Sequence, residues 1–441
     1  MDIDKKHFTG GKTEGGITSS YATEDGVTLK VPYSFKGTIY DDAERAAVLA
    51  AMEQDSLTMG TKTQEFQNKF AKYHKVKHAF ACSNCTTGMH VITQLFDIKP
   101  GDEVIVTPNT FVATSLVILK EGGIPVFADI DPRTFNIDPA DVARKVTKKT
   151  KAIYVVHYAG LMVDMDPIME IAQKHGLKVM EDCAHAIGAT YKGRYAGSIG
   201  DASAFSFHSL KNITTCGEGG MITTNCDNYA AGIQNLRCMN NTQPWDQSVS
   251  EWKFGDKITC KKTSPLEYWL PAHFDVIPWN GHWGSNYRMN EIQAAVGCCQ
   301  MEKLPMLTEK RREIGRKINA GLEGVKGIET VYEPEGYYHV YHLYTLCVNE
   351  KELGGSRDEF MRVLYQEEGV QGILHYQPTF HFTGLQRMGY DPNQCPLSSE
   401  FFYKRELNLP MHPRLTEQNI EDMINGVRNA AAKVRKRHCK A

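Results

Sequence analysis

One lysine lies where a reactive amine is expected. Lys211 follows an apolar run that contains Ser206, and it precedes the glycine-rich turn 217–220. A lysine removed from water in such a place has a lowered pKa, and it can bond to an aldehyde and then move protons. A plain surface lysine is the alternative interpretation.

A second segment, 180–185, ends a predicted buried strand with acidic and imidazole groups. Asp182 lies at the carboxyl end of that strand, where parallel sheets bind their ligands. An aspartate there can hold a pyridine nitrogen protonated through a charge-assisted hydrogen bond, and His185 can reach an oxygen on the same ring. The alternative is an aspartate that caps the next turn and a histidine satisfied in the core.

Hydroxyl groups gather in a third segment, Ser83-Asn-Cys-Thr-Thr-Gly88. Thr86 and Thr87 open a predicted helix there, and a helix N-terminus presents unpaired N–H groups and a positive dipole end to an anion such as phosphate. Simple helix capping is the alternative. Phe111 lies at another strand exit, where it could stack on a flat ring, although a core phenylalanine is commoner.

Several common catalytic signatures are missing from the sequence. It holds no G-x-G-x-x-G after a strand, no P-loop, no H-E-x-x-H and no G-x-S-x-G. One C-x-x-C pair, Cys82 and Cys85, lacks the second pair of a structural zinc site, so we expect no metal and free thiols among the twelve cysteines. A reactive lysine, a buried aspartate, an anion cradle and a stacking aromatic together suit pyridoxal phosphate.

The composition is that of an ordinary globular protein. The 441 residues include 50 Lys+Arg and 52 Asp+Glu, a formal net charge of −2, and 41% are hydrophobic. This balance gives no attraction to nucleic acid or to an anionic membrane. Neither a membrane helix nor a secretory signal is legible, so we expect a cytoplasmic protein.

The elements that must position these residues alternate between strands and helices. Strand patterns occupy 78–83, 103–107, 125–129, 151–156 and 178–182. Helix patterns lie between them at 86–96, 112–121 and 164–175. The alternation predicts an α/β fold with a mostly parallel sheet. Further on, we expect a hairpin-like stretch at 202–224, a helix at 290–316, strands at 341–348 and 370–376, and helices at 356–367 and 416–434.

These patterns divide the chain into three parts. We expect a mobile arm at 1–30, a large cofactor-binding domain at 31–321 and a smaller α/β domain at 322–441. All five tryptophans fall in an insertion at 240–286 of the large domain. Long irregular loops are often functional, so one hypothesis is a wall of the acceptor site, and the other is packing against the body or a partner subunit.

Five motifs occur in one order along the chain: S-N-C-T-T-G-M-H, T-P-N-T-F-V-A-T, E-D-C-A-H-A, F-S-F-H-x-x-K-N followed by G-E-G-G, and G-S-N-Y-R-M. This order resembles the DegT/StrS family of pyridoxal-phosphate sugar aminotransferases, from about Val31 to near Val427. The resemblance implies a fold-type I homodimer, a mixed seven-stranded sheet in the large domain, and an active site at the subunit interface.

The resemblance also implies a role for each matching residue. Lys211 matches the lysine that bonds covalently to the cofactor, Asp182 the partner of the pyridinium nitrogen, and Phe111 the aromatic that stacks on the ring. Phosphate contacts match Thr86, the backbone of Thr87, and Ser206, whereas Asn286 matches an asparagine that reaches the phosphate of the neighbouring subunit.

Two residues differ from the family pattern, and one further motif matches it. His185 stands where many members have glutamine, and both side chains can donate to the ring oxygen. Cys85 replaces the frequent glycine of the phosphate turn, which is tolerable because the turn offers backbone N–H groups. The segment His375-Tyr-Gln-Pro378 resembles the family's H-Y-x-P motif, and we assign it no role.

Members that dehydrate sugars carry histidine at the position of Lys211, so this lysine favours transamination. The resemblance implies transfer of an amino group from L-glutamate, or glutamine, to a keto sugar that is most often nucleotide-linked, in amino-sugar biosynthesis such as that of lipopolysaccharides or antibiotics. A non-nucleotide ketone, such as a ketocyclitol or keto-sugar acid, is the nearer alternative. A non-catalytic cofactor-binding regulator is the more distant one.

Overall fold

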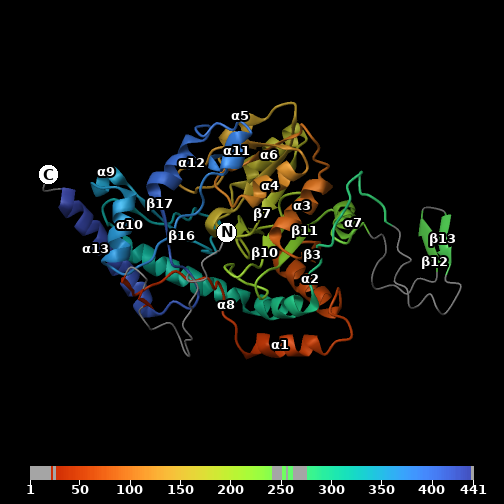
Figure 1. Ribbon diagram of the computed structural model, residues 1–441, viewed down its shortest axis with the longest axis horizontal. Coiled ribbons are helices and arrows are strands. Elements are labelled where there is room, and N and C mark those ends of the chain that lie inside the picture. The colour runs from red at the N-terminus through yellow and green to blue at the C-terminus, as the bar shows by residue number, and fades with distance from the viewer. Residues whose placement is uncertain (1–20, 23–25, 241–250, 255–256, 262–275, 439–441) are drawn as a thin grey trace.

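A seven-stranded sheet forms the centre of the molecule (Figure 1). The computed structural model describes residues 21–22, 26–240, 251–254, 257–261 and 276–438. In the order β3-β11-β10-β7-β6-β4-β5, the strands are His78–Cys82, Gly220–Thr224, Ala202–Ser206, Lys178–Asp182, Thr150–Val156, Glu103–Val106 and Ile124–Phe127. Only β11 runs antiparallel to its neighbours. The predicted α/β fold, its mostly parallel sheet and the hairpin at 202–224 are confirmed.

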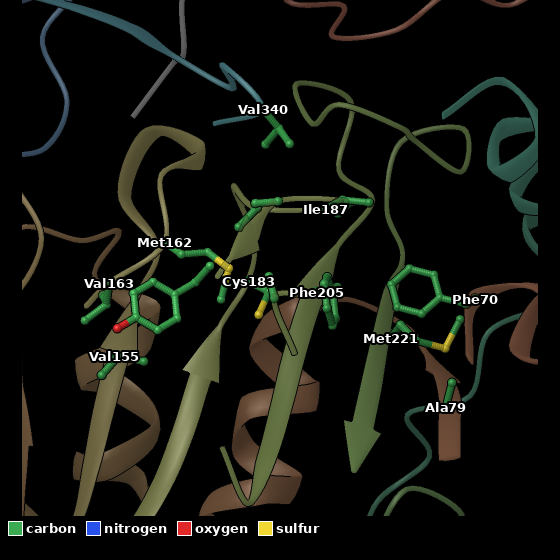
Figure 2. Packing of buried hydrophobic residues seen from close by; sticks show 14 of the residues in the cluster. Phe70, Ala79, Val155, Met162, Val163, Cys183, Ile187, Phe205, Met221 and Val340 are labelled. Carbon is green, nitrogen blue, oxygen red and sulfur yellow. The ribbon is translucent and has the colours of Figure 1, made fainter. Parts of the chain in front are cut away.

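Side chains of successive strand residues enter two separate hydrophobic clusters. In β7, Val179 packs with the first cluster and Met180 with the second, and in β10 Phe205 and Ala204 divide in the same way. This alternation follows from the two-residue period of a strand, so both faces of the sheet are buried. Figure 2 shows part of the first cluster, where Phe205 contacts Phe70 with ring centroids 4.8 Å apart.

Helices cover the two faces as distinct layers. The first cluster contains residues of α2 (Thr61–His74), α5 (Pro139–Lys145), α6 (Met165–His175) and α8 (Glu291–Leu322). The second contains residues of α3 (Cys85–Leu95), α4 (Ala113–Lys120) and α7 (Asp227–Leu236). The predicted helices at 86–96, 112–121 and 164–175 are therefore confirmed within one or two residues, and α8 extends six residues beyond the predicted end at 316.

A third cluster belongs mainly to the C-terminal part of the chain. Its small antiparallel sheet has the order β14-β16-β17, formed by Ile328–Glu329, Tyr344–Val348 and Glu406–Leu409. Helix α10 (Arg357–Gln366) packs against it, and α13 (Glu417–His438) packs on α10 and α8 and shares the same cluster. Figure 1 shows α8 running beneath the molecule from this part toward α1 and α2.

One predicted strand of this part is wrong. Residues 370–376 form only isolated bridges, from Val370 to Val31 and from Ile373 to Asn408. The third strand of the small sheet is instead β17, whose alternating polar residues include the buried Glu406 and Asn408.

The remaining elements are short or lie outside the predicted pattern. They are α1 Asp42–Met52, α9 Glu350–Leu353, α11 Thr383–Arg387, α12 Pro396–Glu400, the 3-10 turns Tyr158–Gly160 and Thr379–His381, the π-turn Phe401–Arg405, and the strands β1 Tyr21–Ala22, β2 Thr28–Leu29, β8 Thr190–Tyr191, β9 Arg194–Tyr195, β12 Glu251–Phe254, β13 Lys257–Lys261 and β15 Tyr337–Tyr338. Among the described residues, no helix is long and apolar enough to cross a membrane.

Two predicted segments lie largely outside the described residues. Of the arm, residues 1–20 and 23–25 are outside, and the described end pairs as β1 with β2. Of the tryptophan-rich insertion, 241–250, 255–256 and 262–275 are outside, and its described centre is the antiparallel hairpin β12–β13. Their assigned roles stay predictions.

Candidate active site

The register of the sheet brings several predicted site residues to one edge. Cys82 pairs with Gly220, and Gly220 pairs with Ser206 across the next strand. Asp182 pairs with Ala204, two residues before Ser206. Because β3, β7 and β10 run in the same direction, the segments that follow them all emerge at this edge.

Asp182 is buried and only partly satisfied by hydrogen bonds. One carboxylate oxygen accepts from the Thr114 hydroxyl at 2.8 Å, and the other accepts from the Ala184 N–H at 3.0 Å. The Cys85 thiol lies 3.9 Å from the second oxygen. Burial raises the pKa of Asp182 above its usual value. A cationic partner such as a protonated ring nitrogen would stabilise the charged form.

Lys211 lies in the connection between β10 and β11, and its neighbours fix that connection firmly. The N–H of Phe207 donates to the Gly219 carbonyl, and that of Ser209 donates to the Gly217 carbonyl. Burial lowers the pKa of Lys211 to about 8, against the opposing charges of Asp182, Cys85 and Glu218. With this pKa a minor part of the lysine is the free amine near neutral pH, which makes it a competent nucleophile and base.

The N-terminus of α3 lies beside these two residues. Asn84 caps it by accepting from the Thr87 N–H at 2.9 Å, so this backbone donor is already engaged. Among the described residues, the N–H groups of Cys85 and Thr86 have no acceptor, and the Thr86 side chain is exposed. Gly220 permits the close approach, because a Cβ there would collide with the backbone of Asn84 and Cys85. These donors form an anion cradle.

His185 and Phe111 lie around the same space. Burial and the charge of Lys211 lower the pKa of His185 well below its usual value. Its Nδ1 accepts from the Ala159 N–H at 3.3 Å, and its Nε2 lies 3.2 Å from the Tyr376 hydroxyl. Phe111 is 59% exposed, and its ring packs edge-on with that of Tyr376.

The remaining predicted residues have different surroundings. Ser206 is buried, and its hydroxyl accepts from the His208 N–H at 3.3 Å. Asn286 is exposed and accepts from Arg288 at 3.0 Å, next to Tyr287, whose carbonyl accepts from the Ser83 N–H. The reach of Asn286 to a neighbouring subunit stays a prediction.

Three tryptophans of the insertion belong to the described residues, and Trp252 is the one in β12. Trp279 packs against the second cluster beside Gly232, whereas Trp283 is 63% exposed. Their proposed part in an acceptor wall stays a prediction.

Sequence reasoning missed two residues that contact the site. Thr114 donates to Asp182, although it stands in a motif that we quoted and assigned to Phe111 alone. Tyr376 contacts His185 from the C-terminal part of the chain. For Thr114 a signal existed, since it lies one helical turn after Phe111. Tyr376 belongs to the H-Y-x-P motif, but no local pattern links it to His185 across 191 residues.

On the other face of the sheet, Glu181 is fully buried with a nearly saturated carboxylate. It accepts from His157 at 2.9 Å, from Ser203, and from the N–H groups of a turn at 197–200. Burial raises the pKa of Glu181, but the hydrogen bonds from His157 and the turn outweigh it and hold the pKa below its usual value. His157 Nδ1 also accepts, from Val163, so this pair is a structural support.

The residues at this edge of the sheet have the chemical groups that pyridoxal phosphate requires. A buried carboxylate with a raised pKa suits the pyridine nitrogen, an amine with a lowered pKa suits the aldehyde, and free N–H groups at a helix start suit the phosphate. Together with the mixed seven-stranded sheet, they define a fold-type I pyridoxal-phosphate enzyme.

The chain belongs to the DegT/DnrJ/EryC1/StrS aminotransferase family, whose model matches residues 38–428. It is therefore an aminotransferase of a sugar aminotransferase family, and its cofactor is pyridoxal phosphate.

Similar proteins agree with this assignment. The spore coat polysaccharide biosynthesis protein SpsC of Bacillus subtilis is 35% identical over 407 residues, covering 90% of this chain and 96% of the relative. GDP-perosamine synthase of Caulobacter vibrioides is 36% identical over 392 residues, covering 87% and 94%. The structure of Helicobacter pylori PseC, an aminotransferase involved in the biosynthesis of pseudoaminic acid, has a TM-score of 0.78 at 26% identity and covers 91% and 99%.

Proposed function

We propose that this protein transfers an amino group from L-glutamate, or from L-glutamine, to a nucleotide-linked keto sugar. The observation that carries the proposal is the pairing of Lys211, with its lowered pKa, and the buried Asp182 at one strand edge. The acceptor class is supported by similarity to GDP-perosamine synthase and to an aminotransferase of pseudoaminic acid biosynthesis. Similarity to a spore coat polysaccharide protein supports a role in amino-sugar assembly.

Each residue has a distinct task in this proposal. When bound, pyridoxal phosphate supplies an electron sink next to the reacting carbon. Asp182 holds the ring nitrogen protonated, and Thr114 and Ala184 hold Asp182 in place. The cradle at Cys85 and Thr86 binds the phosphate through backbone N–H groups, with the Ser206 hydroxyl nearby.

Lys211 moves the proton. Near neutral pH part of its population is the free amine, which would accept a proton from the carbon that bears the substrate nitrogen and return it to the cofactor carbon on the other side of that nitrogen. The same amine reverses the transfer when the keto sugar is the substrate. Two half-reactions on one lysine predict ping-pong kinetics.

The proposal also includes a cytoplasmic homodimer in which Asn286 reaches the neighbouring subunit's phosphate. Asn286 lies at the surface, beside a segment that contacts the start of the cradle at Ser83. This surface position is compatible with a contact between subunits.

The acceptor is tested on protein whose cofactor has been converted to the amino form. We expect GDP-, UDP- or dTDP-linked keto sugars to restore the original absorption band, and Lys211→Ala to restore none. Reaction with free ketocyclitols or keto-sugar acids, without reaction with any nucleotide-linked sugar, would overturn the nucleotide linkage.

A further inference from the structure

The contact between His185 and Tyr376 joins two distant parts of the chain at the candidate site. His185 follows β7 in the large sheet, whereas Tyr376 precedes β17 in the C-terminal part. The imidazole Nε2 and the tyrosine oxygen are 3.2 Å apart, and the two rings stack with centroids 5.9 Å apart. The contact therefore has a defined geometry of both ring and polar atoms.

The surroundings of His185 determine where its proton lies. Nδ1 accepts the Ala159 N–H, so it must carry a lone pair. The neutral ring then carries its hydrogen on Nε2, which faces the Tyr376 oxygen. Burial and Lys211 favour the neutral ring by lowering its pKa. His185 is therefore the donor in this hydrogen bond, and Tyr376 the acceptor.

Tyr376 consequently keeps its own hydroxyl hydrogen for another acceptor. Burial raises the pKa of this phenol, so the hydroxyl stays protonated. Within the described part of the chain, no acceptor for that hydrogen is present. The tyrosine ring also packs edge-on with Phe111, at 6.1 Å between centroids, and Phe111 is the residue predicted to stack on the cofactor. The free hydrogen thus lies at the wall of the cofactor space.

We propose that Tyr376 is a further cofactor-binding residue, which accepts the His185 Nε2–H and donates its own hydroxyl hydrogen toward the ring oxygen of bound pyridoxal phosphate. The inference rests on the proposed site. Ala159 sets the tautomer of His185, and the Nε2–H of His185 holds the Tyr376 oxygen in place. The stacked rings keep the Tyr376 hydroxyl beside His185, the residue that the family resemblance puts next to the ring oxygen. A residue of the C-terminal part of the chain thereby helps to set the charge on the cofactor's ring oxygen.

The expected consequence concerns the proton shared by the ring oxygen and the nitrogen of the Lys211 linkage. Donors to the oxygen stabilise its negative charge, so the shared proton leaves at lower pH. Weakening the pair reverses this effect and raises the pH at which the visible absorption band titrates. The groups that face the pair electrostatically are Tyr33, Asp182, Lys211, His342, His375 and Glu406.

The test is a pH titration of the visible band of cofactor-loaded Tyr376→Phe, which keeps the ring packing on Phe111 and His185. We expect the midpoint to rise by about one to two pH units relative to wild type. Tyr403→Phe is the matched control, since Tyr403 is an exposed tyrosine of the same C-terminal part whose hydroxyl contacts His381, and its midpoint should stay at the wild-type value. Equal midpoints in Tyr376→Phe and wild type would overturn the inference.

A second measurement keeps the inference testable if Tyr376→Phe does not fold. Imidazole nitrogen shifts in cofactor-free wild type, assigned by comparison with His185→Gln, should show hydrogen on Nε2 of His185. Hydrogen on Nδ1 would overturn the pair. Failure of wild type to bind the cofactor would instead overturn the proposed site, so the two failures are distinguishable.

Discussion

Two neighbouring carboxylates at the end of β7 have opposite surroundings. Glu181 points to the face covered by α2, α5, α6 and α8, where His157, Ser203 and three backbone N–H groups of the turn at 197–200 donate to it. Asp182 points to the face of α3 and α4, where two hydrogen bonds and a distant thiol leave it incompletely satisfied. A saturated buried carboxylate supports the fold, whereas an unsaturated one at a strand end is available to a ligand.

The largest expected effect is on stability and comes from the hydrogen-bonded carboxylate, Glu181. Glu181→Ala should lower the free energy of unfolding by about 3–5 kcal/mol, because it leaves His157 and the turn at 197–200 without their buried acceptor. Denaturant unfolding of cofactor-free protein measures this. Glu170→Ala, on the exposed face of α6, is the control and should change stability by less than about 0.5 kcal/mol. Equal stabilities of the two variants would contradict the structural role.

Asp182→Asn tests the carboxylate that we expect to bind the cofactor. The amide keeps the shape but cannot hold a ring nitrogen protonated, so the transamination rate should fall by about 10²–10³-fold. The cofactor-free variant should fold at least as well as wild type, since burial disfavours the charged carboxylate. Steady-state rates and unfolding curves check both parts. A rate within threefold of wild type would remove Asp182 from the site.

Lys211 extends the comparison to a buried cation. Its folded pKa of about 8 lies below the ordinary value of 10.5, so below pH 8 the folded state carries the full desolvation cost. That cost fades as the pH rises from about 8 to 10.5, because the folded protein loses its proton first. Cofactor-free Lys211→Met should be more stable than wild type by about 1–2 kcal/mol at pH 7.

The difference should shrink toward pH 10.5, measured by denaturant unfolding across this range. Lys174→Met, on the exposed surface of α6, is the control and should show no such pH dependence. A constant difference between pH 7 and pH 10.5 would mean that Lys211 is not the titrating group.

Thr114 should give the smallest effect. Thr114→Val preserves the side-chain shape and removes one hydrogen bond to Asp182, so the rate should fall about tenfold. Thr114→Ser keeps the hydroxyl and should retain most of the rate. If the serine variant is as slow as the valine variant, packing rather than the hydrogen bond explains the loss.

Much of the sheet was predictable because both faces are buried and strand patterns between helices are short and regular. β3, β4, β5, β6 and β7 all lie within one or two residues of their predicted limits. The small sheet was less predictable. Its strand β17 carries the polar residues Glu406 and Asn408, which are buried through tertiary contacts, whereas the apolar run at 370–376 forms only isolated bridges.

The site residues also divide into predictable and unpredictable ones. Asp182 stands at the end of β7 and Lys211 in the connection that follows β10, where sequence position alone predicts a ligand edge. Thr114 and Tyr376 reach the site through side-chain contacts between elements far apart in the chain. Such contacts depend on the packing of the whole fold, which no local pattern encodes.

The half-reaction with the amino donor tests the central claim most directly. Cofactor-loaded wild type mixed with L-glutamate, and separately with L-glutamine, should lose its visible band as the cofactor passes to the amino form, with one 2-oxo acid released per site. Lys211→Ala should show no such conversion. An unchanged wild-type spectrum with both donors, and no released oxo acid, would contradict the proposed amino-donor chemistry.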